Sequence, residues 1–172
     1  MSARVGNFWH GPGDDEEGIN VDDDRGALKL DDVRRVAMGL LARREHSTLE
    51  LRRKLERRRF PDGLIEEALA GLATDNLLSD ERFAEEYVRS YAGRGQGPLK
   101  IRNGLAARGI EPQRADRLLY SSGHDWQALA EDARRRRFGS VIPPEYKERA
   151  RQARFLQQRG FDHEQARSAA HL

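Results

Sequence analysis

The sequence contains no cysteine, which excludes disulfide bonds and metal sites built on thiolates. Aromatic residues make up only 7% of the 172 residues, and runs of β-branched residues are missing, so a large β-sheet is not expected. No apolar stretch approaches the ~18 residues that a membrane span requires. Residues 1–15 also lack the apolar segment of a signal peptide. These absences predict a soluble, cytoplasmic protein.

Charge, by contrast, is abundant and unevenly distributed. Charged residues make up 35% of the chain and hydrophobic residues 37%, a balance that is typical of narrow amphipathic helices. The net charge is +2. Residues 1–27 hold seven acidic residues and two arginines, a net charge of −5, which leaves +7 for residues 28–172. We therefore expect a disordered acidic tail on a basic body that suits a polyanion or an acidic partner.

From residue 31 onward, apolar residues recur at helical spacing, and the whole pattern repeats. Leu55 is matched by Leu105 fifty residues later, and Leu105 is matched by Leu156 at an offset of 51. In the preceding helix, Val33 is matched by Phe83 with the same offset of 50. An internal period of this length indicates a repeat protein whose units each contain three helices.

The expected fold is all-α, with three tandem three-helix, helix-turn-helix-like repeats that form an elongated, curved array. A unit of about 50 residues buries little apolar surface alone, so neighbouring repeats are expected to stabilise one another. The predicted segments are a disordered acidic tail at 1–27 and repeats at 28–76, 77–124 and 125–172.

The most basic stretch is residues 51–60, LRRKLERRRF, in which six of ten residues are lysine or arginine. Leu51 and Leu55 form its apolar stripe, and the rest of the helix is almost entirely cationic. A solvated face is the simpler interpretation, but further cations in the other repeats favour contact with a polyanion or an acidic partner. Arg58, Arg108 and Arg159 recur beside the apolar stripe, where we expect a structural role. The candidate contact residues are Arg52, Arg53, Lys54, Arg57, Lys100, Arg102, Arg134, Arg135, Arg136, Arg137, Arg151 and Arg154.

Other patterns do not predict an active site. The loop GRGQGPLK at 93–100 lacks the ending of a nucleotide-binding loop and reads as a helix–helix connection, although its exposed amides and Arg94 could touch a phosphate. Phe83, Tyr87 and Tyr91 could stack on bases, but their helical spacing favours the core. The five histidines show no metal-ligand spacing. We expect no catalytic residue, cofactor or metal.

Several of these segments together resemble the RecX family of bacterial regulatory proteins. The first repeat contains L-x-x-K-L-x-x-[RK]-x-F at Leu51–Phe60 and A-x-x-L-L-A-R-R-E-H-S at Ala37–Ser47. The second contains L-x-D-x-x-F-A-x-x-Y-V-x-x-Y at Leu78–Tyr91. The third is looser and rests on Arg159-Gly160-Phe161. The resemblance covers about residues 28–172.

The resemblance implies a negative regulator of the RecA recombinase that is not an enzyme. Such proteins lie in the groove of the RecA–DNA filament, block its extension or promote its disassembly, and so inhibit ATPase activity and strand exchange. The chain would then be a monomer that meets DNA weakly or through the filament. The residues alone leave two other classes open: a free-standing helical DNA-binding regulator, and a helical adaptor with only protein partners.

Overall fold

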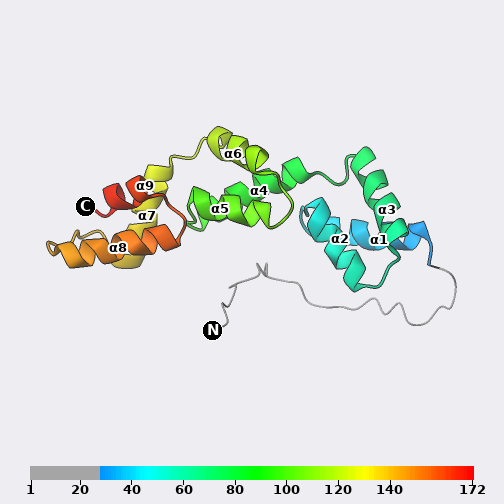
Figure 1. The fold of residues 1–172 in the computed structure, drawn as a ribbon, viewed down its shortest axis with the longest axis horizontal. Helices are drawn as coiled ribbons and strands as arrows, with labels where there is room; N and C mark the ends of the chain where they lie inside the picture. The colour runs from blue at the N-terminus through cyan, green and yellow to red at the C-terminus, as the bar shows by residue number, and fades with distance from the viewer. Residues whose placement is uncertain (1–27) are drawn as a thin grey trace.

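The computed structural model describes residues 28–172, which form nine α-helices and no strand. Figure 1 shows these helices as three groups in a row, so the described part of the molecule is elongated. The predicted all-α fold of three tandem three-helix repeats is confirmed. The predicted acidic tail at 1–27 lies outside the described residues. The helices are α1 (Leu30–Leu41), α2 (Thr48–Arg57), α3 (Asp62–Thr74), α4 (Asp80–Gly93), α5 (Pro98–Ala106), α6 (Pro112–Ser121), α7 (Trp126–Phe138), α8 (Tyr146–Gln158) and α9 (His163–Ala169).

Each group of three helices encloses its own apolar core. In the first, Val33 of α1 and Leu55 of α2 are buried together with Ile65 of α3. In the second, Phe83 and Tyr87 are buried, so their predicted place in the core is confirmed. The third core is smaller and rich in alanine, with Ala130 and Ala133 from α7 and Ala166 and Ala169 from α9. Stability must therefore come partly from the contacts between repeats.

The second helices of the three repeats follow one another head to tail. The end of α8 contacts the start of α5, and the end of α5 contacts the start of α2. In Figure 1, α2, α5 and α8 accordingly lie in succession along one long side of the molecule. This order, which depends on tertiary packing, could not be read from the 50-residue period.

The junction between repeats 1 and 2 is closed by an ion pair. Arg108 Nε donates to Glu50 Oε1 at 2.9 Å, and the two side chains are only 15% and 14% exposed. The Arg108 guanidinium also lies 4.9 Å from the centre of the Tyr87 ring. Next to it, Gly109 approaches Leu49 so closely that an added Cβ would lie 3.1 Å from the Leu49 Cβ. The structural role expected for Arg108 is confirmed.

The junction between repeats 2 and 3 is made by hydrogen bonds between main-chain groups. The Gly97 amide donates to the Arg159 carbonyl at 2.8 Å, and the Leu99 amide donates to the Gly160 carbonyl at 3.0 Å. A Cβ on Gly160 would lie 2.5 Å from the Lys100 backbone nitrogen. Only glycine allows so close an approach, since every other residue carries that atom.

Glycine is needed at the ends of α5 and α8 because another repeat docks there. Gly109 and Gly160 have φ values of 83° and 91° in the left-handed region, and the equivalent Arg59 after α2 has a φ of 61°. Arg59 is exposed, and among the described residues no other repeat docks on its backbone. An arginine is therefore tolerated at position 59, although glycine adopts this left-handed conformation more readily.

Within residues 28–172, no helix is long and apolar enough to span a membrane. The longest described helix, α4, has 14 residues and contains several charged side chains.

Candidate protein and nucleic-acid interface

The head-to-tail order of α2, α5 and α8 places cations from all three repeats along one succession of helices. These helices have 10, 9 and 13 residues, so at 1.5 Å per residue their lengths add up to roughly 50 Å. We use the name cationic line for the predicted contact residues that are exposed on these helices. They are Arg53, Arg57, Lys100, Arg102, Arg151 and Arg154.

On α2, the four predicted cations have different surroundings. Arg52 is partly buried and pairs with Glu66 of α3, with 2.6 Å between its Nη2 and the carboxylate Oε1. Arg53 is exposed and donates to the Ala107 carbonyl beyond α5 at 3.4 Å, and so reaches the neighbouring repeat. Lys54 is partly buried. Arg57 is exposed and has no hydrogen bond or ion pair with any described residue.

The two predicted cations of α5 also differ. Lys100 is exposed beside the junction with repeat 3 and has no hydrogen bond or ion pair within residues 28–172. Arg102 is paired with Asp116 of α6, with 2.7 Å between its Nε and Oδ1. Both members of that pair are about half exposed, so solvent weakens the pair and leaves Arg102 available to a partner.

The structure buries Arg134, so the prediction that it contacts a partner at the surface is wrong. Its side chain is only 6% exposed, and its Nη1 donates to the Gly139 carbonyl at 3.2 Å. It therefore holds the segment that follows α7. Arg135 is exposed and pairs with Asp132 one turn earlier. Arg136 is exposed and donates to the Gly93 carbonyl at the end of α4, at 3.4 Å.

The remaining three predicted cations of repeat 3 come together around one recess, which we call the α7–α8 recess. It has a volume of about 230 Å³. Phe138 and Phe155 contribute their rings to it, 5.2 Å apart and edge to face. Sequence reasoning missed both phenylalanines, because the distance between the end of α7 and the middle of α8 depends on how the two helices pack. The lining residues are Arg137, Phe138, Arg151, Arg154, Phe155 and Gln158.

The loop between α4 and α5 is not available to a phosphate in the way the sequence suggested. Its Gly97 and Leu99 amides are already bonded to the carbonyls of Arg159 and Gly160. The Arg94 carbonyl likewise accepts a hydrogen bond from Arg159, at 3.2 Å. The loop is thus a docking site for repeat 3, and these two amides are no longer candidate contacts.

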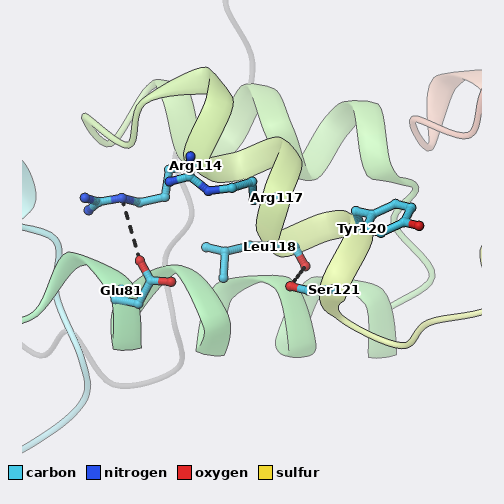
Figure 2. Close-up of a pocket in the computed structure, with 6 residues that line it drawn as sticks. All are labelled: Glu81, Arg114, Arg117, Leu118, Tyr120 and Ser121. Carbon is cyan, nitrogen blue, oxygen red and sulfur yellow. Dashed lines mark hydrogen bonds and ion pairs between the residues drawn. The ribbon is translucent and has the colours of Figure 1, made fainter.

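A second recess lies between α4 and α6, and Figure 2 shows its lining. Arg114 extends toward Glu81, with 3.6 Å between its Nε and the carboxylate Oε2. Arg117 lines the recess as well, and Tyr120 is 94% exposed. Because this recess contains a carboxylate beside its arginines, its net charge is smaller than that of the α7–α8 recess.

His46 is the one histidine that the structure buries deeply among the described residues, and no pattern in the sequence indicated its burial. Its Nδ1 lies 3.0 Å from the Arg44 carbonyl and must carry the proton, since a carbonyl only accepts. Burial, with the positive charge of Arg44 in addition, lowers the pKa of His46 to about 4. The ring is therefore neutral at pH 7 and takes no part in a cationic surface.

Within residues 28–172, no group of three or more histidine and carboxylate side chains could hold a metal ion.

Family models of all three RecX three-helix domains match the chain: the first at residues 34–72, the second at 79–119 and the third at 125–169.

Comparison with curated proteins gives relatives that carry the name regulatory protein RecX. The protein from Halorhodospira halophila is 46% identical over 138 residues, which cover 80% of this chain and 86% of that protein. The protein from Pseudomonas entomophila is 46% identical over 132 residues, which cover 77% of this chain and 85% of that protein.

Solved structures agree in fold. A crystal structure of a regulatory protein RecX has a TM-score of 0.69 at 22% identity, and the match covers 83% of this chain and 73% of that one. RecX from Lactobacillus salivarius has a TM-score of 0.62 at 22% identity and matches over 83% of this chain and 94% of its own. With family models over most of its length and relatives that are 46% identical over 77–80% of it, the chain belongs to the RecX family of regulatory proteins.

Proposed function

We propose that this protein is a negative regulator of the RecA recombinase. It binds in the groove of the RecA–DNA filament, blocks extension or promotes disassembly, and so inhibits ATPase activity and strand exchange. It acts by binding and catalyses no reaction. Family membership supports the regulatory role, because the relatives are named as regulatory proteins. We expect the protein to act in the cytoplasm as a monomer.

The cationic line is the main observation that supports the filament proposal. Its six exposed cations come from all three repeats and follow helices whose lengths add up to roughly 50 Å. Cations distributed over three repeats can touch several neighbouring subunits of a polymer at once. Their positive charge suits a groove lined by acidic protein surface and DNA phosphates.

Within that line, Arg57 and Lys100 are the cations of repeats 1 and 2 that support the proposal most directly. Both are exposed, and neither has a hydrogen bond or ion pair with another described residue. Arg53 is exposed too, but it also contacts the neighbouring repeat. Their charges are therefore available to the filament with little loss of internal contacts, and we expect their removal to leave the fold intact.

The triple substitution Arg53→Ala, Arg57→Ala and Lys100→Ala tests this role. The concentration that half-inhibits the DNA-dependent ATPase of RecA should rise about tenfold, since three exposed charges each contribute about 0.5 kcal/mol. Circular dichroism should show unchanged helicity. Unchanged inhibition by the triple variant would remove these residues from the interface.

A matched control is Arg35→Ala with Arg89→Ala and Arg43→Ala, which removes the same charge from exposed sites outside the cationic line. Inhibition should change less than twofold in this variant. Binding to naked DNA, measured in parallel over a range of salt concentrations, separates the proposal from a free-standing DNA-binding regulator. Strong naked-DNA binding without any effect on RecA would favour that alternative.

A further inference from the structure

The α7–α8 recess is more strongly cationic than the recess shown in Figure 2. Three of its six lining residues are arginines and none is acidic. In the recess between α4 and α6, by contrast, Glu81 pairs with Arg114. The two recesses therefore differ in what they can bind, although each contains at least one exposed or partly exposed aromatic ring.

The positive charge of the α7–α8 recess is only partly compensated within the described chain. Arg151 donates to Glu148 at 2.9 Å on one side of the recess, in a pair that is about half exposed. Arg137 and Arg154 have no hydrogen bond or ion pair with any described residue, and both are exposed. Three guanidinium groups around one small opening repel one another, and a bound anion relieves that repulsion. Guanidinium groups suit phosphate in particular, because their planar N–H groups match two of its oxygens.

The aromatic rings of the recess point to more than a bare anion. Phe138 lies edge to face against Phe155, with an angle of 86° between the two rings. The guanidinium groups of Arg137 and Arg151 lie 5.5 Å and 5.8 Å from the centre of the Phe138 ring. Inorganic phosphate would contact the arginines but would not stack on the rings. A nucleobase, however, stacks on aromatic rings and on guanidinium planes.

We propose that the α7–α8 recess binds one nucleotide unit, with its phosphate between Arg137 and Arg154 and its base against Phe138. The volume of about 230 Å³ suits a single unit rather than a longer segment. The unit comes either from a single nucleic-acid strand or from a free nucleotide. An acidic peptide fits less well, because its carboxylates would engage the arginines without stacking on the rings. The inference rests on the proposed function only for its biological role, because the binding tests use this protein without RecA.

The first test measures binding of the full chain to a fluorescein-labelled oligothymidylate by anisotropy. The variant Arg137→Ala with Arg154→Ala should bind about tenfold more weakly, and the slope of log affinity against log salt should become shallower by about 0.7, as expected for one lost phosphate contact on a single strand. The control, Arg35→Ala with Arg89→Ala, removes the same charge elsewhere and should change affinity less than twofold. Equal losses in both variants would reduce the effect to general charge and overturn the proposal.

The second test asks whether the base is held. The wild-type chain should prefer oligothymidylate over an abasic strand of the same length by at least about fivefold, as expected for a stacked base. Phe138→Leu keeps an apolar side chain and should abolish that preference while binding to the abasic strand stays unchanged. If the wild-type chain shows no preference for the strand that carries bases, the proposed stacking on Phe138 is wrong.

The third test identifies the source of the nucleotide unit. If ATP displaces the oligothymidylate at concentrations below about 1 mM, the recess accepts free nucleotides; if ATP does not compete, the recess takes its unit from a strand. If neither ligand binds while RecA is still inhibited, the inference fails and the proposed function stands. If the recess binds as described and RecA is unaffected, the proposed function fails and the inference stands.

Discussion

Arg57 and Arg108 both lie at the end of a second helix, yet their surroundings give them different roles. Arg108 is mostly buried, paired with Glu50 and placed over the ring of Tyr87. Arg57 is exposed and has no hydrogen bond or ion pair among the described residues. Removing one partner from a buried pair costs about 3 kcal/mol or more, whereas an exposed arginine costs little to replace. The basic composition therefore combines structural arginines with arginines that remain available to a partner.

His46 makes the stability of the first repeat depend on pH. Its pKa falls from the ordinary histidine value of 6.5 to about 4 in the folded chain, because burial and the charge of Arg44 disfavour the protonated ring, while Glu50 favours it. Between these pH values the unfolded chain binds a proton that the folded chain does not. Stability should therefore fall as pH drops from 6.5 to 4, by up to about 1.4 kcal/mol per pH unit.

The variant His46→Asn tests this linkage, because an asparagine amide can still donate to the Arg44 carbonyl but does not titrate. Urea unfolding at several pH values should show a shallower loss of stability below pH 6.5 in this variant than in the wild type. The exposed His163 provides the control, and His163→Asn should follow the wild-type curve. Parallel curves for His46→Asn and the wild type would contradict the assignment of a depressed pKa.

At the scale of helices, the repeats are joined through the ends of their second helices. Gly160 occupies one of the tightest of these contacts, with no room for a side chain against the backbone of Lys100. Gly123 offers a close comparison, since it has a φ of 70° but no atom within 4 Å of an added Cβ. Both glycines therefore adopt a left-handed backbone conformation, but only at Gly160 would an added Cβ also clash with a neighbouring repeat.

Gly160→Ala should lower the free energy of unfolding by several kcal/mol, because backbone strain of about 1–2 kcal/mol adds to an overpacking cost of about 1–3 kcal/mol. Gly123→Ala should lower the free energy of unfolding only by the backbone strain of about 1–2 kcal/mol. Urea denaturation of both variants measures the difference, and limited proteolysis of Gly160→Ala should cut between repeats 2 and 3 first. Equal losses for the two variants would show that repeat 3 does not depend on this close contact.

The sequence predicted the helices and their repetition well, because amphipathic spacing and the 50-residue period are local signals. It could not predict which helix ends meet, since docking depends on tertiary contacts between residues such as Gly97 and Arg159. For the same reason it counted Arg134 as exposed and missed Phe138 and Phe155. A buried arginine and an exposed one look alike in a basic run of sequence, and only the packing of neighbouring helices separates the two.

At the scale of the whole molecule, the head-to-tail second helices place exposed cations of three small repeats in succession. Each repeat alone would present only two of the six residues of the cationic line, whereas the array presents all six on helices whose lengths add up to roughly 50 Å. A partner that is itself a repeating polymer can meet several of these cations at once, and such contacts reinforce one another. This geometry, together with the family to which the chain belongs, is what motivates the proposed binding along the RecA–DNA filament.

The measurement that tests this account most directly is DNA-dependent ATP hydrolysis by RecA with this protein titrated from well below one molecule per recombinase. A regulator that blocks filament growth acts at the end of the filament or at few sites along it, so inhibition should be strong at substoichiometric amounts. The account predicts such inhibition by the wild-type chain at physiological salt. Undiminished ATP hydrolysis at equimolar amounts of the protein would contradict the account.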